Sequence, residues 1–142
     1  MQIVRSTAPL PSSMQRRRLA LQALASRLAG HLPGRIVVAG GPRSGKSWLA
    51  EQLRPIDYRL HDGEELRRAG VGLGPEASLI ASRWLDEPGP WFCENVIMGR
   101  ALRKWMLHNP DGAPADLVIW VNDPIERRAA SQETMATGCA TV

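Results

Sequence analysis

Short apolar runs alternate with segments of helical periodicity along most of the chain. The runs contain many β-branched residues, which is typical of strands, and continuous runs such as "RIVVA" are typical of strands covered on both faces. The expected strands are residues 35–39, 56–60, 91–95 and 116–121. The expected helices are residues 47–53, 64–69, 76–87, 96–107 and 124–138. This alternation predicts an α/β domain with a parallel sheet and helices on both faces, in which ligands bind beyond the carboxyl ends of the strands.

The first third of the chain has a different pattern. Leucines recur at approximately helical spacing within residues 14–32, which predicts an amphipathic helix that packs on the domain. Residues 1–13, with two prolines, are expected to be a loose tail. The chain is therefore divided into a basic tail and helix over residues 1–33 and one α/β domain over residues 34–142.

Composition narrows the class of protein. With 142 residues, 44% of them hydrophobic and 23% charged, the chain fits a single globular domain. No apolar run reaches the roughly 20 residues of a membrane-spanning helix, and the basic start lacks the apolar stretch of a signal peptide. We therefore expect a cytoplasmic protein without a membrane partner. The two cysteines and three histidines show no metal-ligand spacing.

The net charge of +4 comes from the N-terminal region. Residues 1–35 carry six arginines and no acid, which leaves 12 basic and 14 acidic side chains in the rest of the chain. Such a segment can bind nucleic acid or another acidic surface. The favoured interpretation is instead that these arginines are the solvated face of a helix packed on the domain. The oligomeric state stays open.

The stretch "GGPRSGKSW" follows the first expected strand directly and contains a complete G-x-x-x-x-G-K-[ST] pattern. In this pattern backbone N–H groups turn inward around phosphate oxygens, and the following helix N-terminus adds positive charge. The lysine neutralises the β and γ phosphates, and the serine hydroxyl holds Mg²⁺. The sequence thus predicts ATP and Mg²⁺ as cofactors, against the alternative of a simple glycine turn. The expected nucleotide-binding residues are Gly40, Gly41, Arg43, Ser44, Gly45, Lys46, Ser47 and Trp48.

Two residues of this stretch have open roles. Arg43 either approaches phosphate or faces water. Trp48 stands where kinases commonly have a second small hydroxyl residue, and its indole is expected to pack inward and to reshape the nucleotide site.

A phosphoryl-transfer site also needs carboxylates near the metal and the attacking group. Glu94 ends the third expected strand at the correct edge and is the first candidate for the Mg²⁺–water or general-base role, unless it is only a polar strand end. Asp62 follows the second strand and either orients a substrate hydroxyl or caps the next helix. Asp116 lies at the opposite edge and is interpreted as a surface or capping acid, while Asp123 is expected in a turn.

Basic residues that follow these strands are candidates for contacts with phosphate or an anionic substrate. Arg100, Arg103 and Lys104 lie on the helix after Glu94, where solvated charge is an equal alternative. Arg127 and Arg128 are the candidates for lid arginines.

With these residues placed, residues 35–138 resemble the P-loop NTPases of the nucleoside and nucleotide kinase group. "WFCENVI" is similar to that group's strand ending in Glu-Gly or Asp-Gly, with Asn95 in place of glycine, and "LHDGEEL" is similar to its acceptor-binding acid. The resemblance implies a three-layer fold with a parallel sheet of about four strands in the order 2-3-1-4, in which the strand bearing Glu94 lies beside the phosphate-loop strand. Members of that group generally also have a fifth strand and a lid of several arginines, whereas this sequence offers four expected strands and only Arg127 and Arg128 for the lid.

The leading hypothesis is a small phosphotransferase that moves the ATP γ-phosphoryl group to a nucleoside, nucleotide or similar small hydroxyl compound. The chain would then be a minimal or truncated kinase. The alternatives are a nucleotide-binding or interaction module with little turnover and a nucleic-acid-associated ATPase. A GTPase is less favoured, because the chain has no Asn-Lys-x-Asp motif.

Overall fold

The computed structural model describes residues 1–5, 14–29, 34–41 and 45–121. Its centre is a five-stranded, all-parallel sheet in the order β1-β5-β2-β4-β3. The strands are β1 (Gln2–Arg5), β2 (Arg35–Gly40), β3 (Arg59–His61), β4 (Trp91–Glu94) and β5 (Leu117–Val121). All strands are parallel, so their carboxyl ends share one edge, and the loops at that edge are where a ligand site is expected.

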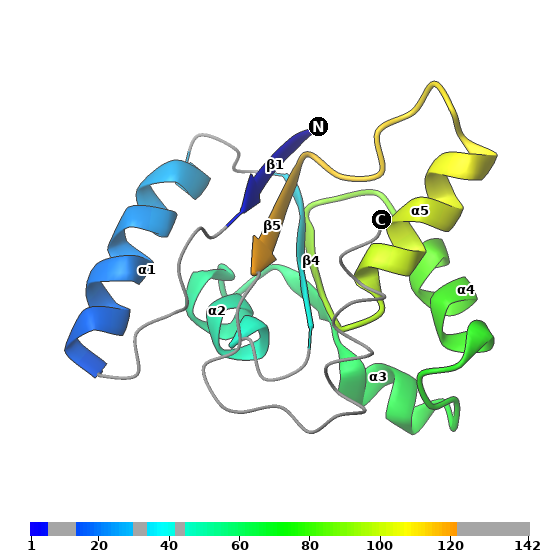
Figure 1. Cartoon of the computed structure of the whole chain (residues 1–142), viewed down its shortest axis with the longest axis horizontal. Coiled ribbons are helices and arrows are strands. Elements are labelled where there is room, and N and C mark those ends of the chain that lie inside the picture. The colour runs from blue at the N-terminus through cyan, green and yellow to red at the C-terminus, as the bar shows by residue number, and fades with distance from the viewer. Residues whose placement is uncertain (6–13, 30–33, 42–44, 122–142) are drawn as a thin grey trace.

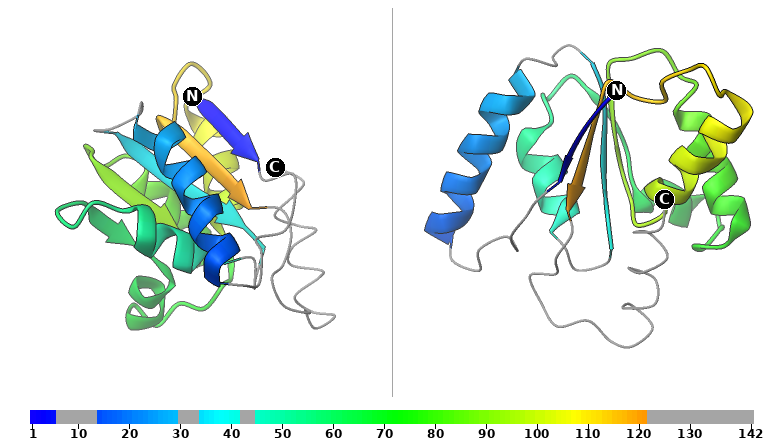
Figure 2. Two further views of the ribbon diagram at one scale, coloured as in Figure 1. Left: turned by 90° about the vertical axis from the view of Figure 1, so that its left-hand side faces the viewer. Right: turned by 45° about the horizontal axis from the view of Figure 1, so that its top comes forward.

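Helices cover both faces of the sheet, which gives the expected layered α/β architecture (Figures 1 and 2). One face carries α1 (Met14–Ala29) and α2 (Lys46–Leu53). The other carries α3 (Gly63–Arg68), α4 (Pro75–Trp84) and α5 (Met98–His108). Pro75 opens α4 at a position where its missing N–H costs nothing.

The alternation of side chains along each strand divides the core into two clusters. In β2, Ile36 and Val38 join the cluster under α1 and α2, whereas Val37 and Ala39 join the one under α3, α4 and α5. All four are completely buried, as expected for a central strand covered on both sides. Burial of these apolar strands between two helical layers is the main source of stability.

The N-terminal residues differ from the expected loose tail. Gln2–Arg5 form edge strand β1, which pairs with β5 from Gln2↔Leu117 onward. Val4 is buried in the core, and the Arg5 guanidinium lies 5.1 Å from the centroid of the Trp120 ring. The described sheet thus has five strands rather than about four. The four expected strands lie in the order β3-β4-β2-β5, with β1 beyond β5.

The second strand is shorter and later than expected. Residues 56–58 form a turn, in which the Tyr58 N–H donates to the Pro55 carbonyl at 3.0 Å and Ile56 is almost fully exposed. The expected strand at 56–60 therefore becomes Arg59–His61. The helix expected at 124–138 lies outside the described residues.

His61, at the end of β3, connects this strand to α3 and to the loop before β4. Its completely buried ring is 2.7 Å from Glu65 Oε2 through Nδ1 and 2.8 Å from Glu87 Oε2 through Nε2. The ring also stacks on Trp84, with centroids 4.8 Å apart. These contacts fix α3 against the sheet beside the edge where the strands end.

Replacing His61 with phenylalanine should lower the free energy of unfolding by about 1–3 kcal/mol. Phenylalanine preserves the stack on Trp84 but leaves two carboxylates without their ring partner. The decrease in the free energy of unfolding therefore measures the contribution of the polar contacts. Chemical denaturation measures it, with the exposed His108→Phe as the matched control. Equal stability of His61→Phe and the wild type would show that the two contacts are energetically neutral.

Asp116 lies at the amino edge of the sheet, opposite the expected ligand edge. Its Oδ2 accepts from the Arg35 backbone N–H at 2.7 Å, and its Oδ1 lies 3.2 Å from Arg35 Nη2. Burial alone raises the pKa of Asp116, but the hydrogen bonds and the charge of Arg35 outweigh it, so the pKa is lowered. The side chain is a surface acid that fastens β2 to the start of β5.

Asp116→Asn is expected to reduce stability at neutral pH by up to about 1 kcal/mol, since both partners are partly exposed. Folding lowers the pKa of Asp116, so its contribution is present above the unfolded pKa and is lost as the pH falls through the folded pKa. The two proteins should therefore converge in acid. Urea denaturation of both proteins from neutral pH into acid tests this pH dependence, with Asp111→Asn as control. A stability difference that grew in acid would contradict the assignment.

Candidate functional site

The glycine stretch joins the carboxyl end of β2 to the start of α2. Gly40 ends the strand with φ 149°, and Gly45 caps the helix with φ 86°. Both values lie in the region that favours glycine, so the turn explains why these residue types stand here. Gly41 is buried between them. Arg43 and Ser44 lie outside the described residues.

Lys46 begins α2 and points back toward the turn. It is only 7% exposed, and its Nζ donates to the Gly41 carbonyl at 3.2 Å. The same Nζ is 3.9 Å from Glu94 Oε1 on the neighbouring strand. A buried ammonium is held between the glycine turn and a carboxylate, beside the positive end of a helix.

Glu94 ends β4, next to β2, and is 5% exposed. Burial raises its pKa, while the charge of Lys46 and a hydrogen bond from Ser47 act in the opposite direction. The carboxylate of Asp62 raises the pKa further. The structure thus brings Lys46, Ser47, Asp62 and Glu94 together at the carboxyl edge of the sheet.

A cavity of about 520 Å³, which we call the edge cavity, opens among Ser47, Asp62 and Glu94. It is lined by Ser47, Glu51, Arg54, Leu60, Asp62, Gly63, Glu64, Arg67 and Glu94. Arg54 and Arg67 were missing from the sequence-based site, and they supply its positive charge beside Lys46. For Arg54 the sequence does contain a signal, because residues 47, 51 and 54 recur at the spacing that places them on one face of a helix.

Asp62 caps α3, as one of the two alternatives expected, and it also lies at the edge cavity. Its Oδ1 accepts from the N–H groups of Glu64 at 3.1 Å and Glu65 at 3.3 Å, so it is the N-cap of α3. The same side chain lines the edge cavity. Capping uses Oδ1, so Oδ2 is the oxygen available to a ligand in the cavity.

Other candidates lie away from this cavity. Trp48 is half-buried and packs against the core cluster under α1 and α2. Arg100 and Arg103 are exposed on α5 and are not among the cavity-lining residues. Lys104 Nζ donates to Ser78 Oγ at 2.7 Å and so joins α5 to α4. Arg127, Arg128 and Asp123 lie outside the described residues.

The oxygen atoms of the site suit Mg²⁺ better than a transition metal. Within the described ranges, no group of three or more His, Cys, Asp or Glu side chains is arranged to hold a metal. Mg²⁺ bound with a nucleotide needs only one or two protein oxygens besides phosphate and water. The Ser47 hydroxyl and the Glu94 carboxylate, which are hydrogen-bonded to each other, are of this kind.

Comparison of the chain with family models, with curated proteins and with solved structures finds no match in any of the three. In the part of the chain that the structure describes, no helix has the length and apolar character needed to cross a membrane.

Proposed function

We propose that the chain binds ATP with Mg²⁺ at residues 40–47 and transfers the γ-phosphoryl group to a hydroxyl group of a small acceptor. The observation that carries the proposal is that Ser47, Asp62 and Glu94, from three separate segments, line the edge cavity, with the buried Lys46 Nζ 3.9 Å from Glu94 Oε1. In this proposal the domain is a P-loop NTPase of the kinase type. The position of β4 beside β2 supports it, because this pairing places Glu94 next to the glycine turn.

Each side chain has a role in the proposed reaction. Lys46 balances charge on the transferring phosphoryl group, and the backbone N–H groups of the turn hold the phosphates. Ser47 and Glu94 would hold the metal, Glu94 directly or through water, and Mg²⁺ would neutralise charge on the β and γ phosphates. Asp62 orients the acceptor hydroxyl and takes its proton. Most of the catalysis is then positioning and electrostatic stabilisation.

Members of the group that the chain resembles generally have a fifth strand, which the sequence pattern did not predict here. Strand β1 adds a fifth parallel strand beside β5, although it comes from the N-terminal end of the chain, and this supports the proposed class. The second candidate function is a nucleotide-binding module with little turnover. It is favoured by the capping bonds of Asp62, which fix this carboxylate to α3.

Transfer of labelled γ-phosphate from ATP to a panel of nucleosides, nucleotides and sugars tests the proposal, with Asp62→Asn as the first variant. Asparagine caps helices about as well as aspartate, so the fold should hold within about 0.5 kcal/mol. Loss of the proton acceptor should slow transfer by about 100-fold or more. The exposed Asp57→Asn is the matched control. If Asp62→Asn transferred phosphate at the wild-type rate, Asp62 would be only a cap, and ATP binding without transfer to any acceptor would favour the binding module.

A further inference from the structure

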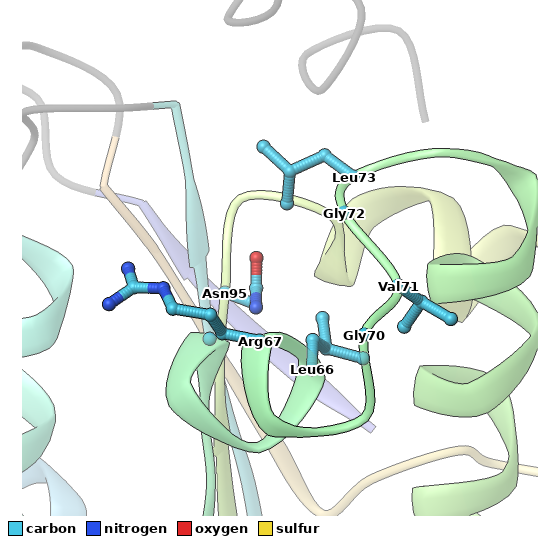
Figure 3. Close-up of a pocket in the computed structure, with 8 residues that line it drawn as sticks. Leu66, Arg67, Gly70, Val71, Gly72, Leu73 and Asn95 are labelled. Atoms are coloured by element: carbon cyan, nitrogen blue, oxygen red, sulfur yellow. The ribbon is translucent and has the colours of Figure 1, made fainter.

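A second cavity of about 430 Å³, which we call the apolar cavity, lies beside the edge cavity (Figure 3). It is lined by Gly63, Leu66, Arg67, Gly70, Val71, Gly72, Leu73 and Asn95. Gly63 and Arg67 line both cavities, and Asn95 directly follows Glu94 in the chain. A molecule in the apolar cavity therefore lies next to the carboxylates of the edge cavity.

Asn95 presents an unpaired hydrogen-bond donor to the apolar cavity. Its side chain is 4% exposed, and its Oδ1 accepts from the Ile97 N–H at 3.3 Å. Its buried Nδ2 has no hydrogen-bond partner among the described residues. Figure 3 shows the side chain pointing from the end of β4 into the space between α3 and the loop of Gly70, Val71 and Leu73. An unpaired buried donor is unfavourable, and a ligand that supplies an acceptor removes this cost.

Gly63 lies against this donor. A Cβ atom at position 63 would lie 3.3 Å from Asn95 Nδ2. The backbone of Gly63 is not left-handed, and it is the first residue of α3, where alanine would form the helix more readily. The conformation of the chain therefore does not require glycine here, whereas a Cβ atom would press on Nδ2.

The rest of the lining indicates a neutral ligand. Leu66, Val71 and Leu73 provide apolar surface. Arg67 is the charged residue among the lining residues, and its Nη1 is held 2.6 Å from Glu64 Oε1. The volume lies within the usual range for small-molecule sites, which combine an apolar lining with a few polar groups. A flat heterocycle with one buried carbonyl or ring nitrogen matches this combination.

We propose that the apolar cavity, together with Asn95 Nδ2, is the acceptor site and takes an uncharged heterocyclic compound that carries a hydroxyl group. This inference rests on the proposed function. The heterocycle accepts the hydrogen bond of Nδ2, and its hydroxyl group lies at the edge cavity beside Asp62 and Glu94. The hydroxyl oxygen forms a bond to the γ-phosphorus while the bond to the β,γ-bridging oxygen breaks. ADP leaves, and the hydroxyl proton passes to Asp62.

The test is an NMR titration of the ¹⁵N-labelled protein with uridine, cytidine, adenosine and guanosine, followed at the side-chain amide of Asn95. At least one nucleoside should shift this resonance with saturation and should bind more tightly than its monophosphate. Gly63→Ala, followed at the Asn95 side-chain amide, and Asn95→Ala, followed at the backbone amide of Val71, should each weaken binding by about tenfold. Gly74→Ala is the matched control, because a Cβ there meets no atom within 4 Å and Gly74 does not line the cavity. Gly63→Ala should remain folded, since alanine favours the helix.

Three results would overturn the proposal: no shift with any nucleoside, tighter binding of the monophosphates, or undiminished binding by Gly63→Ala. Because the titration contains no ATP, its outcome is separate from that of nucleotide binding. Nucleoside binding without ATP binding would support a ligand site in the apolar cavity and refute the proposed phosphotransferase. ATP binding without nucleoside binding would refute the acceptor site in the apolar cavity and leave the proposed phosphotransferase standing.

Discussion

ATP with Mg²⁺ is expected to stabilise the wild-type protein against heat, and Lys46→Met is expected to lose this stabilisation. A ligand at 100 times its dissociation constant adds about 2.7 kcal/mol to the free energy of unfolding. The Lys46 ammonium is buried beside the glycine turn, where its interaction with phosphate is screened less than at the surface. Its removal should therefore weaken nucleotide binding by at least about 100-fold and cancel most of the increment.

The measurement for Lys46 is the change in melting temperature caused by nucleotide, not the melting temperature itself. Lys46→Met also removes the charge beside Glu94 and so alters the free protein. The chain offers a matched control, because Lys104 is its only other lysine and joins α5 to α4 through Ser78. Lys104→Met should retain the increment. If nucleotide raised the melting temperature of Lys46→Met as much as that of the wild type, Lys46 would not contact phosphate.

Glu94→Gln should lower the rate of phosphoryl transfer by about 10²–10⁴-fold and, at neutral pH, make the free protein more stable. Burial raises the pKa of Glu94, so the folded chain binds this proton more tightly than the unfolded chain. The side chain contributes stability below its unfolded pKa, and this contribution is lost as the pH rises through the folded pKa. Glutamine does not ionise and avoids the loss.

Urea denaturation from about pH 4 to pH 8 measures the effect of Glu94→Gln on stability, and the transfer assay measures its effect on activity. The stability gain should be smallest in acid and should reach a plateau above the folded pKa. Glu76→Gln, an exposed change in the first turn of α4, is the control and should show no such rise. A glutamine variant that was both less stable at neutral pH and fully active would contradict the assignment of Glu94.

The central strands and the phosphate-loop pattern were the most predictable features of the chain. "IVVA" and "LVIWV" are apolar throughout because β2 and β5 are covered on both faces, and such runs are visible in the sequence alone. Strand β1 was missed because "QIVR" is short and its partner β5 lies more than 100 residues later in the chain. Pairing over that separation leaves no local signal.

The site was predictable where a residue type is tied to a backbone conformation, as for Gly40 and Gly45. The charged residues of helices were harder to assign. An arginine that lines a cavity and an arginine in solvent can both lie on the polar face of a helix, so the sequence periodicity does not distinguish them. Arg54 and Arg67 line the edge cavity, whereas Arg100 and Arg103 are exposed on α5. The unpaired Nδ2 of Asn95 could not have been predicted, because hydrogen-bond satisfaction depends on the folded surroundings.

Calorimetric titration of the wild-type protein with a non-hydrolysable ATP analogue, with and without Mg²⁺, measures nucleotide binding at the glycine turn. We expect saturable binding of one nucleotide per chain that is markedly tighter with Mg²⁺, because Ser47 and Glu94 present metal-binding oxygens beside the turn. Absence of binding under both conditions would contradict this expectation, and the glycine turn would then be a structural connection between β2 and α2.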